Sequence, residues 1–398
     1  MKTYTAKIEN AATPAIVADD MFLTTDMATA AGSKMLDNYM SLFEAEVLTR
    51  AKAAGYTVAG KADVGEFAID LLGETSYNGM EEATLKNAAA EIVKAGEAEA
   101  AIVFDVNGSV RRAAAQYDLI SIKPTYGTVS RFGTIPVACS GETVSVLAAN
   151  TADAQKLLDA IAGHDAKDGT SLSDDVCAQI KSDADVAAVK KVAILSSMVK
   201  AADADVAAKI EDAKAVFAAN GIEVQEIDDE IFAAARVAWN ILMSAELCNN
   251  VSRYDGVKYG YRAANFNGLD ELYTNSRTEA FGELLKTVIL YGSDVLSTDN
   301  YDKVYDKALR IRRVMVEALN KLFAEFDAVM LPACSAMAYT AEQVKANKYM
   351  ALEENLFTAP ASISGLPTVV VGGVQLMGKA FSDQALIGAA KLFEKEGK

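Results

Sequence analysis

Residues 190–227 read KKVAILSSMVKAADADVAAKIEDAKAVFAANGIEVQEI, and this stretch decides the fold class. It opens with KKVAILSS, a short apolar run with the composition of a buried strand. Residues 201–220 then repeat apolar positions with helical periodicity, and the helix is expected to stop at Gly221. IEVQEI follows as a second strand. A strand, a helix and a strand in this order form a βαβ-like unit, which implies an α/β protein whose sheet is covered by helices on both faces.

Other segments of the chain repeat these two patterns. Short runs rich in β-branched and apolar residues predict further buried strands at 101–105, 327–332 and 367–373. Residues 151–161 predict an amphipathic helix, whose apolar face holds Ala154, Leu157, Leu158 and Ile161. Residues 301–326 predict an exposed helix or helix pair. With no repeat and only six prolines, nothing marks a linker, so we expect one domain over residues 1–398 with a helical subregion at about 230–320.

The charge and hydropathy of the chain bear on its partners. Lys and Arg number 38 against 55 Asp and Glu, which gives a net charge of −17. Proteins bind nucleic acid largely through cations that displace phosphate counterions, so we expect no direct contact with tRNA or DNA. No apolar run has the length of a membrane span, which is roughly 20 residues. The start, MKTYTAKIENAAT, also lacks the apolar core of a signal peptide, so we expect no membrane association.

The inventory of histidine and cysteine limits the chemistry. The single histidine, His164, lies in the polar stretch IAGHDAKDGT, which predicts a surface position and not a place in a Ser-His-Asp triad. No His or Cys cluster has the spacing of a zinc site, and a magnesium site of oxygen ligands carries no signal in the sequence, so no cofactor is expected. The cysteines lie far apart and form no CxxC pair, as expected in the reduced cytoplasm: Cys139, Cys177, Cys248 and Cys334.

Three stretches carry a resemblance to a known family. They are AGSKMLDNYMSLFEAEVLTRAKAAGYTVAGKADVGEFA at 31–68, SIKPTYGTVSRFGTIPVACS at 121–140, and the run from ELCNNVSRYDGVKYGYR at 246–262 to FTAPASISGLPTVVVGGVQLMG at 357–378. In this order they resemble the amidase signature family, and within it the A subunit of the tRNA-dependent amidotransferases. The phrases KPTYGxVSRxG and RYDGVKYGYR are specific to that pattern.

The resemblance implies a fold and a reaction. The family fold is a large mixed β-sheet of about eleven strands flanked by helical layers. The family reaction is hydrolysis of an amide, glutamine in the amidotransferases, through a Ser–cis-Ser–Lys triad. The ammonia released then passes to a partner subunit that uses it on a charged tRNA. The partners that the resemblance implies are therefore amidotransferase B/C-type subunits or a paralogous A subunit.

Two positions of the triad are occupied. The lysine of the family's GKxNxxEFA segment is placed at Lys61, in GKADVGEFA, and the nucleophile of its DTGGS segment at Ser109. A lysine acts as a base only when its pKa falls towards the working pH. Before the serine, Val106, Asn107 and Gly108 occupy the family's oxyanion loop. Asn107 replaces a glycine there, and asparagine tolerates a left-handed backbone better than most residues.

The relay serine of the triad has no counterpart. The family supplies it from a Gly/Ser-rich GGSSGGS loop, which is missing between Lys61 and Ser109. The Ala-rich run EEATLKNAAAEIVKAG stands in that region and predicts a helix. The relay serine lies in a non-proline cis peptide, which costs about 3–4 kcal/mol and needs a loop that enforces it. Thr84 and Ser76 are the hydroxyls that remain as substitutes.

Contacts expected for an amino-acid substrate are altered as well. The family has two consecutive arginines at the positions of Thr287 and Val288, one of which clamps the substrate carboxylate. The acidic residue that meets the substrate's amino group is Asn355, and a lysine of the pattern PIxVKDN is Ala18, in PAIVADD. Tyr259, in YDGVKYGYR, and Asn355 remain candidates for lining a pocket.

Three hypotheses about function follow. The chain is a degenerate homologue of the A subunit, a pseudoenzyme impaired in glutamine hydrolysis that acts as a binding or scaffold subunit. Alternatively, Ser109 and Lys61 form a rebuilt Ser–Lys amidase site for an uncharged amide. In the third hypothesis the chain is a working amidotransferase A subunit that supplies ammonia for tRNA-dependent amidation. We favour the first, because relay, carboxylate clamp and amine contact change together.

Overall fold

The protein is described by a computed structural model that covers residues 3–79, 87–182, 189–227 and 230–394. Eleven strands form a single mixed sheet in the order β1-β3-β2-β4-β6-β5-β10-β11-β9-β7-β8. The strands are β1 Tyr4–Lys7, β2 Ala15–Asp19, β3 Thr57–Ala62, β4 Ala100–Asp105, β5 Ile120–Lys123, β6 Thr143–Ala148, β7 Lys191–Leu195, β8 Glu223–Ile227, β9 Ala328–Pro332, β10 Thr368–Val371 and β11 Val374–Gly378. The large mixed sheet expected from the family resemblance is thus confirmed.

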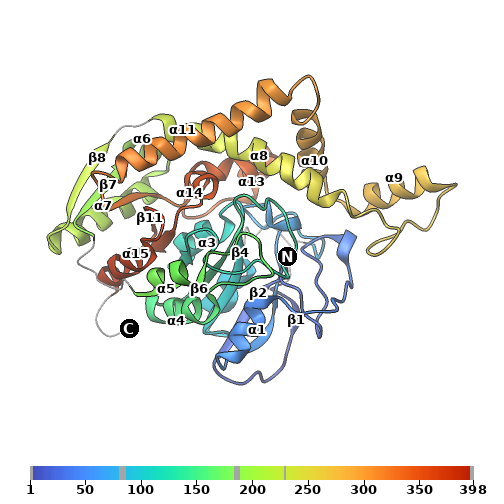
Figure 1. Cartoon of the computed structure of the whole chain (residues 1–398), viewed down its shortest axis with the longest axis horizontal. Coiled ribbons are helices and arrows are strands. Elements are labelled where there is room, and N and C mark those ends of the chain that lie inside the picture. The colour runs from blue at the N-terminus through green and yellow to red at the C-terminus, as the bar shows by residue number, and fades with distance from the viewer. Residues whose placement is uncertain (1–2, 80–86, 183–188, 228–229, 395–398) are drawn as a thin grey trace.

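Helices surround the sheet (Figure 1). They are α1 Glu46–Ala53, α2 Ala88–Lys94, α3 Ser109–Tyr117, α4 Thr151–Ile161, α5 Asp174–Ser182, α6 Ser196–Lys200, α7 Ala204–Ala219, α8 Ala234–Val251, α9 Leu269–Ala280, α10 Glu283–Val295, α11 Asp306–Leu322, α12 Ala341–Ala346, α13 Met350–Glu353, α14 Ala359–Ser364 and α15 Asp383–Ala390. Short 3-10 turns lie at Lys34–Leu36, Glu66–Ala68, Glu230–Ala233, Glu354–Leu356 and Lys391–Phe393, and a π-helical turn, Tyr301–Tyr305, precedes α11.

The βαβ-like unit predicted at residues 190–227 is confirmed. β7 and β8 pair in parallel, from Lys191 opposite Glu223 to Leu195 opposite Ile227. Helix α7 connects them and buries one side of its surface, at Val206, Ile210, Ala213 and Phe217. Gly221, with φ 73°, follows the helix and turns the chain into β8, as a left-handed residue after a helix commonly does.

The two faces of the sheet carry separate hydrophobic layers. Alternate residues of β4 point to opposite faces, so Ala101 and Val103 pack with α2 and α3, whereas Ile102 and Phe104 belong to the larger core. That larger core also takes in the apolar face of α4, which is the face predicted from residues 151–161. Helices therefore cover both faces, as the α/β pattern predicts.

The region predicted to be helical at about 230–320 is helical throughout most of its described part. Its α8, α10 and α11 lie along one edge of the molecule, and α9 projects at the far end (Figure 1). Among the described residues only one helical stretch, Glu230–Val251, has the length and hydropathy of a membrane span. Trp239, Leu242 and Leu247 of that stretch are buried in the core, as in the central helix of a globular protein. That the whole chain folds as one domain stays a prediction.

Candidate active site

The turn between β4 and α3 presents Ser109 at the first position of a helix. β4 ends at Asp105, and the chain passes through Val106 and Asn107 to Gly108, whose φ of 91° places it in the left-handed region. A Cβ on Gly108 would lie 2.4 Å from Cβ of Thr358, so only glycine fits this approach. The N-terminal end of a helix carries partial positive charge, which favours an anion beside Ser109.

The side chain of Asn107 forms hydrogen bonds from this turn to other parts of the chain. The left-handed turn belongs to Gly108 and not to Asn107, which is absent from the described non-glycine residues of positive φ. Asn107 Nδ2 donates to the carbonyl of Ile69 at 3.0 Å. Its Oδ1 accepts from Asn355 Nδ2 at 2.8 Å and from Trp239 Nε1 at 3.2 Å. The residue that replaces the family glycine therefore anchors the loop to three other segments of the chain.

The two candidate pocket residues lie in different surroundings. Asn355 is fully buried and donates to Asn240 as well as to Asn107, and its Oδ1 has no hydrogen-bond partner. Tyr259 is 39% exposed, and its ring lies 5.9 Å from that of Tyr39 and 6.0 Å from that of Tyr254. Neither residue lines the cavity that contains Ser109. Tyr259 thus belongs to a surface aromatic cluster.

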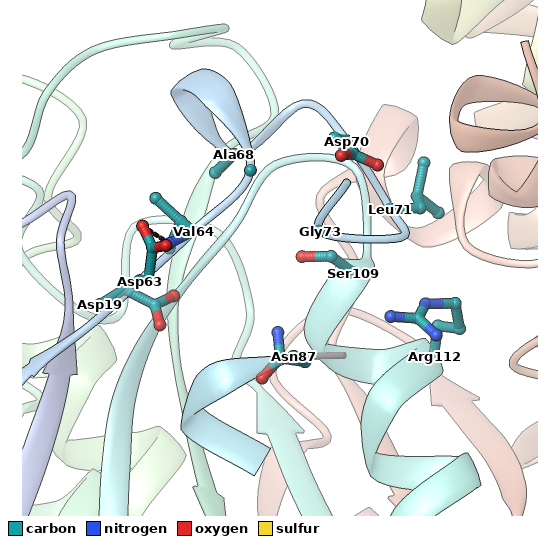
Figure 2. A pocket seen from close by; sticks show the side chains of 11 residues that line it. Asp19, Asp63, Val64, Ala68, Asp70, Leu71, Gly73, Asn87, Ser109 and Arg112 are labelled. Carbon is teal, nitrogen blue, oxygen red and sulfur yellow. Dashed lines mark hydrogen bonds between the residues drawn. The ribbon is translucent and has the colours of Figure 1, made fainter. Parts of the chain in front are cut away.

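Ser109 lines a small polar cavity of about 10 Å³ (Figure 2). That volume holds about one water molecule. Asp19, Asp63, Asp70 and Arg112 are among the residues of its wall. Burial raises the pKa of Asp19 to about 8, although a backbone N–H of Phe104 donates to its carboxylate at 2.8 Å. Asp19 is therefore largely protonated at neutral pH.

Lys61 is buried on β3, and its ammonium group is bound by neighbours other than Ser109. Nζ donates to the carbonyl of Ala28 at 2.9 Å and to the hydroxyl of Thr29, and it lies 3.5 Å from Oδ1 of Asp20. Burial lowers the pKa of Lys61 to about 8, and the Asp20 carboxylate opposes part of that shift. Lys61 is not among the residues that line the Ser109 cavity. The pairing of Lys61 with Ser109 stays a prediction.

Ala18 occupies the second lysine position of the family pattern, and it lies nearer to Ser109 along the sheet. β2 and β3 are parallel neighbours, with Ala18 opposite Lys61, so the side chains at 18 and 61 leave the same face. The sheet order is β3-β2-β4, and Ser109 follows the turn after β4. Position 18 is thus one strand closer to the nucleophile position than Lys61, and it carries only a buried methyl group.

Of the two hydroxyl groups considered as substitutes for the relay serine, the structure describes only that of Ser76. Ser76 donates to both oxygens of Asp63, at 2.9 and 2.7 Å, and is therefore held within its own loop. Thr84 lies outside the described residues. The helix predicted in this region is present at Ala88–Lys94, and Asn87 caps it by accepting from the N–H of Ala90 at 2.9 Å.

Similarity to known proteins assigns the chain to a family. The Amidase family profile matches residues 15–387. The chain belongs to the amidase family. It is 33% identical to the A subunit of glutamyl-tRNA(Gln) amidotransferase from Lachnoclostridium phytofermentans, over 96% of this chain and 82% of the relative. The corresponding protein of Streptococcus pneumoniae strain JJA is 32% identical, over 94% and 81%. The resemblance stated from sequence motifs is thereby confirmed.

Solved structures agree with this assignment. The A subunit of glutamyl-tRNA(Gln) amidotransferase from Thermotoga maritima, known from a crystal structure, superposes with a TM-score of 0.80 at 25% identity, covering 99% of this chain and 87% of that one. The urea amidolyase of K. lactis gives the same TM-score at 22% identity, over 95% of this chain and 22% of that one, and shares the fold. The amidase fold expected for the chain is therefore confirmed.

The two positions where the family has arginines make contacts within the protein. Thr287 bonds within its helix, donating to the carbonyl of Glu283 at 3.0 Å, and Val288 is buried. His164 is exposed, as predicted, and the four cysteines are free.

Sequence reasoning named only Ser109 among the residues of the cavity wall, and the buried Arg112 is one of those it missed. Arg112 is only 1% exposed, although its Nε and Nη2 have no hydrogen-bond partner. The sequence shows two consecutive arginines, Arg111 and Arg112, after Ser109 and Val110. Neighbouring residues on a helix point in different directions, so both arginines cannot share one acidic partner. That doubling was the available signal, because buried arginine is uncommon unless it is paired.

Proposed function

We propose that this amidase-family chain is impaired in amide hydrolysis and acts in the cytoplasm as a binding or scaffold subunit. One observation carries the proposal, and it concerns the two lysine positions of the family pattern. Position 18 holds alanine, and the ammonium of Lys61 is bound by Ala28, Thr29 and Asp20. A serine hydroxyl is a weak nucleophile unless a base lies within hydrogen-bond reach.

The surroundings of Ser109 support the same proposal. The cavity beside it is water-sized, and Asn107 and Asn355 are bonded to one another at 2.8 Å at the oxyanion loop. The hydroxyl of Ser76 is held by Asp63. A working site needs room for an amide and a path for the proton, and these contacts of the described residues provide neither.

The partners follow from the relatives and from the charge. The relatives described above are named as A subunits of a tRNA amidotransferase, so the proposed partners are B/C-type subunits or a paralogous A subunit. A net charge of −17 makes this chain a poor binding surface for tRNA itself. The partner is then the one expected to hold the nucleic acid.

A serine-directed fluorophosphonate probe tests the proposal, because labelling requires an activated hydroxyl. The purified chain is incubated with the probe beside Ser109→Ala, and the Streptococcus pneumoniae relative serves as the positive control. We expect equal, background labelling of the chain and of Ser109→Ala, and no glutamine hydrolysis that differs between them. Labelling that maps to Ser109 by peptide mass would overturn the proposal.

A second candidate function is an active Ser–Lys amidase, or a glutamine amidotransferase A subunit. One observation favours it: Ser109 is partly exposed in a cavity at the N-terminal end of α3, the place where a reactive serine benefits from the helix dipole. The labelling experiment separates the two candidates, since only an active enzyme reacts at Ser109.

A further inference from the structure

Helices α9 and α10 meet at Gly282, and α9 projects away from the rest of the molecule (Figure 1). Each helix uses one side to pack on another element. α9 buries Leu272, Ser276 and Ala280 and lies beside the 3-10 turn Lys34–Leu36, whereas α10 packs against α8. Between the two helices lies an open groove of about 340 Å³, which we call the α9–α10 groove.

Apolar and aromatic side chains line both walls of the α9–α10 groove. Tyr273 comes from α9, Phe281 from the corner, and Ile289 and Leu290 from α10. Leu290 is 71% exposed and Tyr273 is 38% exposed. Lys286, Ile289 and Leu290 have the spacing i, i+3 and i+4, so they form one stripe along α10. An exposed apolar surface that runs along both helices in this way marks an interaction site.

The charged side chains in the described lining of the groove are both cations, Arg277 and Lys286. Arg277 Nη1 donates to the carbonyls of Val251 and Tyr254, at 3.0 and 2.8 Å. Lys286 Nζ donates to the carbonyl of Thr278 at 2.9 Å. Neither cation belongs to an ion pair within the part of the chain that the structure describes. Their charge is therefore available to a partner.

The carboxylates around the groove lie outside its lining. Asp255 and Glu66 act on the two cations from beyond ion-pair distance. Glu279 of α9 accepts from the hydroxyl of Tyr261. The net charge of −17 repels an acidic partner at long range, but salt screens charges that are more than about 10 Å apart at 0.1 M. The two cations lie at the contact itself, so they decide which charge fits there.

We propose that the α9–α10 groove docks an amphipathic helix of a partner protein, whose apolar stripe is flanked by Asp and Glu. Two helices that form the walls of a groove accept a third helix between them, with its side chains at i, i+3, i+4 and i+7 packed inward. The apolar stripe would contact Tyr273, Ile289 and Leu290, and the carboxylates would reach Arg277 and Lys286. The inference rests on the proposed function, because it gives the binding role a surface and a partner chemistry.

A peptide library displayed on phage tests the proposal with the full chain as bait. Every member is a helix of about 18 residues with an apolar stripe, and the flanking positions are randomised among Glu, Lys and Gln. Selection on the wild type, with Leu290→Ser as the counter-selection bait, is expected to enrich Glu at the flanking positions. Enrichment of Lys, no charge preference, or no peptide that the wild type keeps and Leu290→Ser loses would overturn the proposal.

Fluorescence anisotropy of the most enriched peptide then measures affinity. Leu290→Ser and Lys286→Glu are each expected to bind it about tenfold more weakly than the wild type. Leu42→Ser, at a leucine that is 97% exposed outside the groove, and Lys307→Glu, at an exposed lysine of α11, are the matched controls and are expected to bind as the wild type does. Equal losses in variants and controls would contradict docking at this groove. Unchanged circular dichroism shows that each variant is folded.

Light scattering of the chain alone separates this proposal from self-association. A dimer that Leu290→Ser dissociates would show that a second copy of the chain fills the groove, and it would overturn the proposal of a different partner. The labelling of Ser109 depends on neither measurement, so a failure of helix docking is distinguished from a failure of the proposed loss of hydrolysis.

Discussion

At the scale of single residues, Arg111 joins four segments through one guanidinium. It pairs with Asp105 at the end of β4 and donates to the carbonyl of Thr358, to Gln375 and to Ser362, at 2.8, 3.0 and 2.8 Å. Removing one partner of a buried ion pair leaves the other charge uncompensated, at a cost of about 3–5 kcal/mol. We expect Arg111→Met to lower the free energy of unfolding in urea by that amount.

The control for this prediction is an exposed pair of the same chemistry. Arg313→Met breaks the ion pair with Glu317 on α11, where the two side chains are 78% and 54% exposed. Exposed pairs of this kind contribute about 0–1 kcal/mol. Equal losses in the two variants would contradict the view that burial makes the Arg111 pair important.

Asp19 makes a prediction about pH. Its pKa in the fold is about 8, against 3.8 in the unfolded chain, because burial disfavours the charged form. The folded state therefore holds an extra proton between these values, so stability from this group is complete below about pH 4 and is lost as the pH rises through 8. The slope is at most about 1.4 kcal/mol per pH unit.

Asp19→Asn removes this titration and keeps an acceptor for the N–H of Phe104. We expect its free energy of unfolding to fall less between pH 5 and pH 8 than that of the wild type, so the variant gains most relative to wild type at pH 8. Urea unfolding at both pH values measures the difference, with Asp270→Asn on the exposed first turn of α9 as the surface control. A constant difference between wild type and Asp19→Asn would show that the carboxyl is not held protonated.

At the scale of elements, the sequence predicts what is local and misses what is brought together by the fold. The periodicity of residues 151–161 and 190–227 depends on neighbours in the chain, and the corresponding α4, β7, α7 and β8 are found there. The match of Ser109 to a family segment likewise puts it at the start of α3. Parallel pairing of β2 with β3 is non-local, and therefore the adjacency of Ala18 and Lys61 does not appear in either motif.

The site's side-chain contacts are equally non-local. The bonds of Asn107 reach Trp239 and Asn355, which are 132 and 248 residues away along the chain. From the sequence, an asparagine at a family glycine position predicts only that the backbone can still turn there. In the structure, the side-chain amide of Asn107 holds the loop to other segments by hydrogen bonds. Burial of Arg112 also depends on segments packed from elsewhere, so the two consecutive arginines at 111 and 112 hint at it without showing which of them is unpaired.

The β4–α3 turn allows this packing to be tested at one glycine. Gly108 has φ 91°, and an added Cβ would lie 2.4 Å from Thr358. We expect Gly108→Ala to cost about 2–4 kcal/mol, from left-handed strain together with overpacking. Gly55 has φ 92° and nothing within 4 Å of the added Cβ, so Gly55→Ala is expected to cost only the strain, about 1–2 kcal/mol. Urea denaturation of both variants isolates the contact with Thr358, and equal costs would contradict it.

At the scale of the whole molecule, one sheet runs through most of the chain. Its strands begin at Tyr4 and end at Gly378, and the helical stretch α8–α11 lies between β8 and β9 in the sequence. Either the helical stretch unfolds with the sheet or it forms a separate cooperative unit. The contacts between α8, the first helix of that stretch, and the rest of the chain indicate which of the two behaviours to expect.

Trp239 on α8 is the single tryptophan, and it reports on this junction. It is fully buried, and its Nε1 donates to Asn107. Its ring packs against Gly141, where a Cβ added to the glycine would lie 2.2 Å from the nearest ring atom of Trp239. The helical stretch is thus packed directly on the turn before α3 and on the segment before β6. We expect the fluorescence of Trp239 and the far-UV circular dichroism to give the same urea midpoint, as in a single cooperative unit. A fluorescence transition at lower urea than the circular dichroism transition would show instead that α8–α11 separates first, and that residues 1–398 are not one domain.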